Sequence, residues 1–255
     1  MKAKIKLSAT IVLYNQDKKE LKKAINSFLN IKLIKHLFIV DNSSFPNIDV
    51  SEFQTNEISY ISTRKNLGFS KANNHTINRI KGFSDYHLVL NPDVFFEENI
   101  VEELIKRLRE EEDVSLITPK VVFPNGDNQY NIRKYPSAFD LIIRKLHVFK
   151  GRIHKQEYRD RDLSKPLYPE AIHGCFMLFK TEDFVSLGGF DERYFLYMED
   201  IDICRKIDAI GKKKLYYPNV AVTHVLKQGS SKSFKLLLYH LSSAIKYFLK
   251  WRRYN

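Results

Sequence analysis

The chain has 255 residues, and a hydrophobic content of 44% is enough for the core of one large α/β domain with an appendage. A formal net charge of +12 favours an anionic partner, such as a phosphorylated small molecule, a nucleic acid or an acidic membrane surface. Cys175 and Cys204 have no CxxC spacing, which argues against a disulfide framework or a zinc cluster and favours a reducing, cytoplasmic compartment. No run of 18 apolar residues predicts a transmembrane helix.

Strands and helices are predicted to alternate along the first half of the chain. Continuous β-branched runs are typical of strands buried on both faces of a parallel sheet, and apolar residues at helical spacing follow most of them. The expected strands are 7–14, 36–44, 59–64, 86–94 and 114–123, and the expected helices are 18–30, 68–80 and 97–112. This alternation predicts an α/β fold with a mostly parallel sheet flanked by helices.

The pattern changes between Asn125 and about Pro169, where a basic, aromatic segment is predicted to form a long functional or mobile loop. Regular structure is then expected to return. The predicted elements are a strand at 170–180, a short helix ending at Gly188 and Gly189, a helix from about Glu199 to Ile210 stopped by Gly211, and a last strand ending at His224.

Polar clusters follow four of the predicted strands, at Tyr14–Asn15, Asp41–Ser44, Arg64–Gly68 and Asn91–Val94. Each cluster alone fits an ordinary turn or helix cap. Ligands of open α/β sheets bind at the carboxyl ends of the strands, and four such clusters in succession favour a binding site there.

Asn91-Pro92-Asp93 is good turn chemistry, but an Asp at a strand tip also suits Mg²⁺ or Mn²⁺ bridging a diphosphate. A lone histidine is more often structural than ligating. His224 nevertheless stands before a Gly/Ser-rich turn with Lys227 and Lys232, which favours a second metal ligand or a phosphate clamp. The absence of GxGxxG and GxxxxGK[ST] argues against dinucleotide oxidoreductases and P-loop NTPases.

An acidic block, GGFDERYFLYMEDIDICRK at 188–206, interrupts this basic chain. Its acids are Asp191, Glu192, Glu199, Asp200 and Asp202, set among Phe190, Tyr194, Phe195 and Tyr197. The acids either cap the helix and pair with Arg193, Arg205 and Lys206, or supply a general base. First-turn amides favour the ionised form of Glu199, and helical spacing separates Asp200 from the face shared by Glu199 and Asp202.

The segments TIVLYN, IVDNSS, RKNLGFSKANN, LNPDV, HGCFMLFK, the acidic block and VTH follow one another between residues 7 and about 232. With them the chain resembles the family 2 glycosyltransferases of the GT-A (Rossmann-like) fold, and among these the rhamnosyltransferase-like enzymes of bacterial surface-polysaccharide synthesis. The resemblance implies a donor site in which Asp41 contacts the base or ribose, Asn66 and Gly68 shape the pocket, and Asp93 takes the metal position of the DxD motif. Asn91 departs from that motif because it replaces the first Asp. The full donor-binding set is Tyr14, Asn15, Asp41, Asn66, Gly68, Asn91 and Asp93, with Asp93 and His224 on the metal.

The resemblance also implies a reaction. Asp200 of the ED motif is the first candidate for the base of an inverting transfer, and Glu199 the second. The aromatic side chains of the block can stack on a sugar ring and exclude water. The QxxRW pattern of processive members is absent, which favours addition of one sugar. The implied cofactor is Mg²⁺ or Mn²⁺, the preferred donor is dTDP-rhamnose with a UDP-hexose as alternative, and the acceptor is a lipid-linked glycan of O-antigen or capsule type.

Two other classes remain open. A sugar-phosphate nucleotidyltransferase needs a glycine-rich loop after the first strand, and LYNQDKKE contains no glycine. A nonenzymatic basic module would bind nucleic acid or an anionic glycan, although no nucleic-acid partner is expected for the preferred function.

The predicted catalytic domain spans 1–231, with a nucleotide-sugar-binding half at 1–97 and an acceptor and catalytic half at 98–231. A basic amphipathic tail at 232–255 follows. Its apolar stripe comprises Phe234, Leu237, Leu238, Leu241, Ile245 and Phe248, and its polar residues are Lys235, His240, Ser242, Ser243, Lys246, Lys250 and Arg253. Such a helix either lies on the inner face of an anionic cytoplasmic membrane or packs on the domain or a second subunit.

Overall fold

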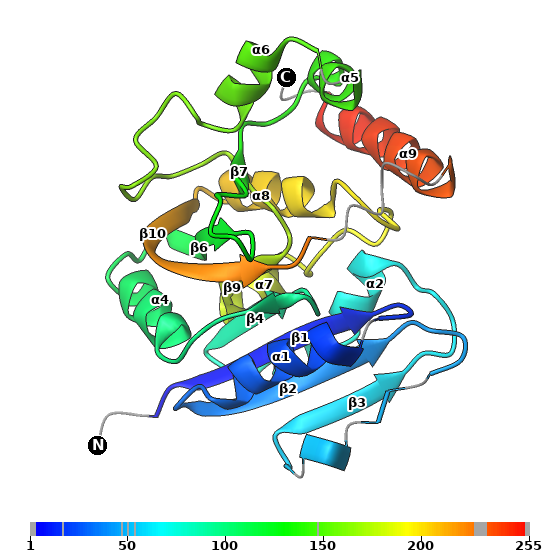
Figure 1. Ribbon diagram of the computed structural model, residues 1–255, viewed down its shortest axis with the longest axis vertical. Coiled ribbons are helices and arrows are strands. Elements are labelled where there is room, and N and C mark those ends of the chain that lie inside the picture. Colours follow the sequence, from blue (N-terminus) through cyan, green and yellow to red (C-terminus); the bar gives the residue numbers. More distant parts are fainter. Residues whose placement is uncertain are drawn as a thin grey trace.

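The computed structural model describes residues 4–16, 18–46, 48–49, 51–53, 55–146, 148–226 and 234–252 (Figure 1). An eight-stranded sheet runs through these residues in the order β3-β2-β1-β4-β9-β6-β10-β5. Its strands are β1 (Lys6–Leu13), β2 (Ile34–Asp41), β3 (Ile58–Ser62), β4 (Tyr86–Leu90), β5 (Val94–Phe95), β6 (Val114–Val122), β9 (Phe176–Lys180) and β10 (Lys213–His224).

Most neighbouring strands of this sheet are parallel. β1 pairs in parallel with β2 and β4, β2 with β3, and β6 with β10. The antiparallel strand β9 lies between β4 and β6, and the short β5 pairs antiparallel with β10 at the edge. The carboxyl ends of β1, β2, β4, β6 and β10 therefore face the same side of the molecule. The predicted mostly parallel sheet is confirmed.

Helices cover both faces of the sheet, because alternate side chains of each buried strand point to opposite faces. α1 (Lys18–Leu29) and α4 (Ile100–Arg109) pack Phe28 and Leu104 into the core of one face. α7 (Thr181–Ser186) and α8 (Glu199–Ala209) pack Phe184, Ile203 and Ile207 into the core of the other face. Two buried cores result, with the sheet between them (Figure 1).

Two predicted elements are interrupted. The expected helix 68–80 is divided into α2 (Phe69–Asn74) and α3 (Ile77–Ile80), because the hydroxyl of Thr76 bonds inward to Asn73 and Thr10 at 2.9 Å each. The expected strand 170–180 is divided into β8 (Ala171–Ile172) and β9. β8 pairs with β7 (Ile132–Arg133) in a separate two-stranded sheet.

The predicted long loop at 125–169 is partly wrong, because it contains α5 (Ala138–Leu146) and α6 (Lys150–Gln156) besides β7. Ser137 and Asp140 cap α5 reciprocally: the Asp140 carboxylate accepts from the Ser137 amide at 2.8 Å, and Ser137 Oγ accepts from the Asp140 amide at 3.2 Å. This Ser-x-x-Asp spacing is a helix-start signal within an otherwise irregular sequence.

The predicted C-terminal helix is present as α9 (Phe234–Trp251), which lies beside α5 at one end of the molecule (Figure 1). Within the described ranges, no helix combines the length and the apolar character that a bilayer crossing needs. The division of the catalytic domain at 97 and 231 stays a prediction.

Candidate active site

The predicted donor-binding residues of the first strands lie together at the carboxyl edge of the sheet. Asp41 is the last residue of β2, where it pairs with Leu13 of β1 and with Ser62 of β3. Its carboxylate is buried and accepts hydrogen bonds from the Tyr60 hydroxyl at 2.5 Å and the Ser43 amide at 2.8 Å. Burial and the Asp41 carboxylate raise the pKa of Tyr60, which therefore remains a donor to Asp41.

Short polar contacts join the neighbouring loops to Asp41. The backbone amide of Asn15 donates to Ser43 Oγ at 2.9 Å, and Tyr14 beside it is 51% exposed. The Asn66 side chain accepts from the Gly68 amide at 2.9 Å, and the Gly68 carbonyl accepts from Asn42 Nδ2 at 3.1 Å. These contacts hold three loops of the edge in a fixed arrangement, with the Tyr14 ring open to a ligand.

Asp93 and His224 face each other farther along this edge. A carboxylate oxygen of Asp93 lies 3.3 Å from His224 Nε2, and the Asp93 carbonyl accepts from the Val225 amide at 2.9 Å. The contact follows from the pairing of β5 with β10, which sets His224 opposite Val94. The predicted pair is thus brought together. Lys227 and Lys232, which were predicted to assist His224, lie outside the described residues.

Gln129 fixes the orientation of His224. Its Oε1 accepts from His224 Nδ1 at 2.9 Å, while its Nε2 donates to the His224 carbonyl at 2.6 Å. This leaves Nε2 of the ring directed at Asp93, which is the arrangement of a metal-ligating histidine supported from behind. Burial lowers the pKa of His224, but Asp93 and Cys175 outweigh burial and raise it to about 10. A divalent cation between Asp93 and His224 would displace the proton from Nε2.

Asp93 and His224 suit a divalent ion, Mg²⁺ or Mn²⁺, whose remaining ligands come from the bound substrate and water. Among the described residues, no three His, Cys, Asp or Glu side chains form a metal cluster, so the chain offers the two ligands Asp93 and His224. Mg²⁺ typically takes one or two protein ligands and completes its shell with phosphate oxygens and water. These residues would therefore hold the ion on a bound diphosphate.

Asp200 is attached to the same edge through the segment before β9. Its Oδ2 accepts from the Gly174 amide at 3.1 Å, and its Oδ1 accepts from the Ile201 amide at 2.8 Å. The next residue, Cys175, accepts through its carbonyl from the Asn91 amide at 2.9 Å. A Cβ on Gly174 would lie 3.4 Å from Cβ of Asp200, so the glycine allows this close approach. Asp200 remains half-buried.

Glu199 has a different environment, although it precedes Asp200. It is only 6% exposed, and Oε2 has no hydrogen-bond partner among the described residues. Burial, reinforced by the charge of Asp200, raises the pKa of Glu199 well above its usual value. The expectation that the helix amides keep Glu199 ionised is therefore wrong, because desolvation outweighs the helix dipole. The two adjacent acids therefore have different surroundings, since Glu199 is buried and Asp200 is half-buried on the sheet edge.

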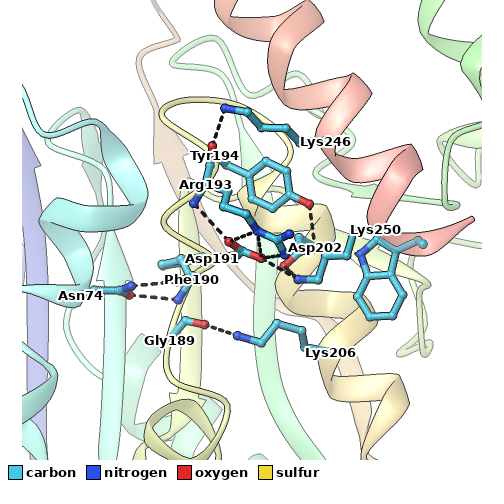
Figure 2. A network of polar contacts seen from close by, with 11 residues as sticks. Asn74, Gly189, Phe190, Asp191, Arg193, Tyr194, Asp202, Lys206, Lys246 and Lys250 are labelled. Atoms are coloured by element: carbon cyan, nitrogen blue, oxygen red, sulfur yellow. Dashed lines mark hydrogen bonds and ion pairs between the residues drawn. The ribbon is translucent and has the colours of Figure 1, made fainter.

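Asp202 and Asp191 are held by α9 (Figure 2). Lys250 Nζ lies 2.7 Å from Asp202 Oδ2 and 2.8 Å from Asp191 Oδ2. Asp202 Oδ1 also accepts from Tyr194 at 3.0 Å and from Trp251 Nε1 at 2.7 Å. Burial raises the pKa of Asp191, but Arg193 and Lys250 lower it by more. Both acids therefore act as structural anchors. The predicted pairing of Asp191 with Arg193 is present, whereas Lys206 donates to the Gly189 carbonyl.

The aromatic residues of the block divide into two groups. Phe190 and Tyr194 are both 1% exposed; Phe190 packs against Phe69 and Phe184 in the core, so these two are not available to stack on a sugar. Phe195 and Tyr197 are half-buried and contact the rings of Tyr239 and His240 on α9, with ring centroids 4.5 and 5.2 Å apart.

Gly68 joins the acidic block to the part of the carboxyl edge that carries Asp41, Ser43 and Asn66, called here the donor edge. Its φ of 79° is in the left-handed region, and a Cβ there would collide with the carbonyl oxygen of Phe195. That same carbonyl accepts from the Phe69 amide at 2.8 Å. The glycine predicted for the donor pocket therefore also lies at the contact between the donor edge and the acidic block. This contact of Gly68 and Phe69 with the Phe195 carbonyl is called here the seam.

Several residues of the site were missed by sequence reasoning. Gln129 and Arg133 lie in the segment predicted as a loop, and Lys250 and Trp251 lie in the tail. Only the basic and aromatic character of those segments could have pointed to them, because their partners are distant in sequence.

Comparison with known proteins places this arrangement in a family. A profile described as glycosyl transferase family 2 matches residues 8–186, which include β1–β4, Asp93 and β9. The chain belongs to glycosyl transferase family 2.

Two curated relatives of this family 2 chain are rhamnosyltransferases by name. Rhamnosyltransferase WbbL of Escherichia coli is 28% identical over 193 residues, 72% of this chain and 71% of its own. N-acetylglucosaminyl-diphospho-decaprenol L-rhamnosyltransferase of Mycobacterium tuberculosis is 28% identical over 177 residues, 64% of this chain and 57% of its own.

Solved structures confirm the GT-A fold of this family 2 chain. GalNAc-T7 with UDP, GalNAc and Mn²⁺ superposes with a TM-score of 0.67 at 16% identity, covering 89% of this chain and 44% of that one. The mannosyltransferase PcManGT of Pyrobaculum calidifontis, in complex with GDP-Man and Mn²⁺, gives 0.62 at 14% identity over 96% of this chain and 65% of that one. The chain thus spans a little over half of the mycobacterial relative and less than half of GalNAc-T7.

Proposed function

We propose that the protein transfers a single sugar, with inversion, from a nucleoside diphosphate donor to a lipid-linked glycan. The observation that carries this proposal is the attachment of Asp200 to the sheet edge that also presents Asp93 and His224. A base and a diphosphate-holding pair at one edge are what such a transfer requires.

In the proposed reaction an acceptor hydroxyl attacks the anomeric carbon of the donor sugar from the face opposite the diphosphate. Asp200 takes the hydroxyl proton as the new glycosidic bond forms, and the nucleoside diphosphate leaves with the electrons of the broken bond. Asp93 and His224 would hold Mg²⁺ or Mn²⁺ when it is bound, and the ion then neutralises charge on the leaving diphosphate. Asp41, Asn66 and Gly68 would position the nucleoside, and Asn91 and Asn15 would line the donor pocket.

The names of the relatives support dTDP-rhamnose as the first candidate donor, with a UDP-hexose as the alternative. One of them is named for a diphospho-decaprenol acceptor, which supports a lipid-linked acceptor here. We place the reaction at the inner face of the cytoplasmic membrane, where such an acceptor would be reached by a cytoplasmic enzyme.

A cluster of arginines supports an acceptor that carries phosphate. Arg133, Arg144 and Arg159 all donate hydrogen bonds to the single carboxylate of Glu157, at 2.6 Å, 2.7 Å and, from Nε of Arg159, 2.7 Å. Three guanidinium groups on one carboxylate leave an excess of positive charge, and β7, which carries Arg133, pairs with β8 in the segment that leads to Gly174 and Asp200. Guanidinium groups suit phosphate recognition. We therefore propose this cluster as the site of the acceptor diphosphate.

A thermal-shift panel tests the function. The ligands are dTDP-rhamnose, UDP-glucose, UDP-galactose, UDP-GlcNAc and GDP-mannose, each with and without Mn²⁺ or Mg²⁺. The true donor should raise the melting temperature in a metal-dependent way, since it binds only the folded protein. Asp93→Ala should remove the metal dependence and weaken donor binding by about tenfold, or ~1.4 kcal/mol. A salt-sensitive gel shift with no response to any nucleotide sugar would instead favour a nonenzymatic binding module.

A further inference from the structure

α9 is attached to the domain through polar contacts and through buried aromatic side chains. Ser243 Oγ donates to the Leu196 carbonyl at 2.9 Å, Lys246 Nζ donates to the Arg193 carbonyl at 2.8 Å, and Lys250 reaches Asp191 and Asp202 (Figure 2). Buried Tyr247 and Trp251 complete that face. The inner face of α9 is therefore already covered by its own domain.

The outer face of α9 is an apolar stripe. Five large apolar side chains, spaced three and four residues apart, are 49% to 75% exposed: Phe234, Leu238, Leu241, Ile245 and Leu249. Positions at this spacing share one side of a helix. The stripe thus runs the length of the helix and has no cover among the described residues.

Exposed apolar side chains of α5, and of the residues between α5 and α6, enlarge this apolar surface. α5 lies beside α9 in Figure 1, and its Leu141 packs against the cluster that contains Tyr247 and Trp251. Its outward side chains and those that follow it are 40% to 66% exposed: Phe139, Ile142, Leu146, Val148 and Phe149. Of the sixteen large apolar side chains that are exposed among the described residues, ten therefore gather on α9, on α5 and on the residues just before α6. Apolar side chains at this density mark an interaction surface.

The exposed charges of this surface, called here the α5–α9 surface, are mainly positive. Lys145, Lys150, Lys155, Lys235 and Arg252 are exposed on it or at its rim. The acids of the same segments are held in internal ion pairs, Asp140 with Arg152 at 2.5 Å and Glu157 with the arginine cluster. α9 itself contains no Asp or Glu. The surface is therefore apolar with a cationic rim.

We propose that the α5–α9 surface docks on a lipid bilayer that contains anionic lipids. Apolar side chains would enter the boundary of the acyl chains while the lysines contact phosphate headgroups, as in interfacial amphipathic helices. A second copy of the chain is a poorer occupant, because a two-fold interface through this surface would bring the same cations together.

The docking surface would explain how the enzyme reaches a membrane-anchored acceptor. This role rests on the proposed function. α5 carries Arg144 of the arginine cluster on one side and the exposed Ile142 and Leu146 on another. The inner face of α9 holds the segment that leads into Asp200. Docking on this surface would thus bring the diphosphate of a membrane-anchored acceptor to the arginine cluster, which β7 and β8 connect to the segment that bonds Asp200.

Flotation of the full chain with vesicles tests the surface without any sugar transfer. The vesicles are pure phosphatidylcholine, or phosphatidylcholine with 30% phosphatidylglycerol. The wild type should bind the anionic vesicles, and Leu241→Gln/Ile245→Gln should weaken that binding at least tenfold while keeping helix propensity. The matched control Ile34→Gln/Tyr168→Gln removes two exposed apolar side chains elsewhere and should bind as the wild type does.

A charge-reversal pair tests the rim. Lys145→Glu/Lys150→Glu should reduce binding to anionic vesicles, whereas Lys81→Glu/Lys106→Glu, with two exposed lysines outside the surface, should change it much less. Sedimentation of the same proteins gives the oligomeric state.

The outcomes separate cleanly. Wild type that binds no vesicles, or variants that all bind alike, would overturn the docking surface and leave the transfer reaction untouched. A wild-type dimer that Leu241→Gln/Ile245→Gln dissociates, without vesicle binding, would overturn it in favour of a second copy. Vesicle binding without transfer from any nucleotide sugar would support the surface and count against the proposed function alone.

Discussion

The donor edge and the acidic block are stabilised in different ways. At the donor edge, Asp41, Ser43 and Asn66 bond residues that are two positions away or on adjacent strands. In the acidic block, Asp202 depends on Lys250 and Trp251 of α9, which lie 48 and 49 positions farther along the chain. The donor edge is built from strand ends, whereas the acidic block is held from outside by a helix.

The comparison shows that adjacent acids can have unrelated roles. Glu199 is buried with a raised pKa, Asp200 is attached to the sheet edge, and Asp202 anchors α9. These differences arise from tertiary partners, since all three acids lie in the first turn of one helix. Mutations that remove one partner at a time can therefore separate chemistry from structure.

The largest expected effect is on catalysis. Asp200→Asn keeps the shape of the side chain but cannot accept a proton, so transfer should fall at least about 100-fold while donor binding persists. Glu199→Gln is the control, because the raised pKa of Glu199 disfavours its ionised, proton-accepting form, and its initial rate should remain close to that of the wild type. A large loss in Glu199→Gln with a mild loss in Asp200→Asn would move the base to Glu199. If both variants transferred at the wild-type rate, the exposed Glu192 would be the next candidate, because Asp191 is held by Arg193 and Lys250.

The next effect is on stability. Lys250→Met removes the cation from a fully buried Asp202, and breaking such a pair should cost about 3 kcal/mol of unfolding free energy. Lys246→Met removes only a bond to an exposed backbone carbonyl and should cost less than about 0.5 kcal/mol. Urea unfolding of both variants measures the difference, and equal losses would show that α9 does not hold the block through Asp202.

The seam between the two regions can be broken at Gly68. Gly68→Ala should destabilise the protein by about 2 kcal/mol, from left-handed strain plus the collision with Phe195. Gly82→Ala is the matched control, since Gly82 has a φ of 73° but no atom within 4 Å of a built Cβ, and it should cost about 1 kcal/mol. Similar losses in the two variants, measured by thermal unfolding, would argue against the seam.

The smallest effect concerns pH. Because the pKa of Glu199 is raised in the folded protein, the unfolded chain releases this proton first as the pH rises above its usual value of 4.5. Stability from the protonated form is complete below 4.5 and is lost as the pH rises through the folded pKa. Glu199→Gln cannot ionise, so its stability relative to the wild type should rise between pH 4 and pH 8. A difference that does not change with pH would contradict the assigned burial of a neutral acid.

The grouping of the donor-edge residues could be predicted from the sequence, and the reason is physical. Parallel strands end at one edge, so polar residues after β1, β2 and β4 had to come together. Asp93 and His224 were predicted as ligands of one metal, Asp93 from the family resemblance and His224 from the basic Gly/Ser-rich turn after it, and the structure brings them together. The roles of Glu199, Asp200 and Asp202 could not be separated, since helical spacing gives the direction of a side chain but not its partner. Gln129 and α5 were missed because their partners lie in other segments.

The dependence of Asp202 on α9 also sets an order of assembly during synthesis. The residues of the donor edge are complete in the chain long before Lys250 is added. At about 5–20 residues per second, the 48 positions between Asp202 and Lys250 correspond to roughly 2 to 10 s of synthesis. During that time Asp202, which is buried in the folded protein, lacks the Lys250 cation. The acidic block is therefore the last part of the site to become stable.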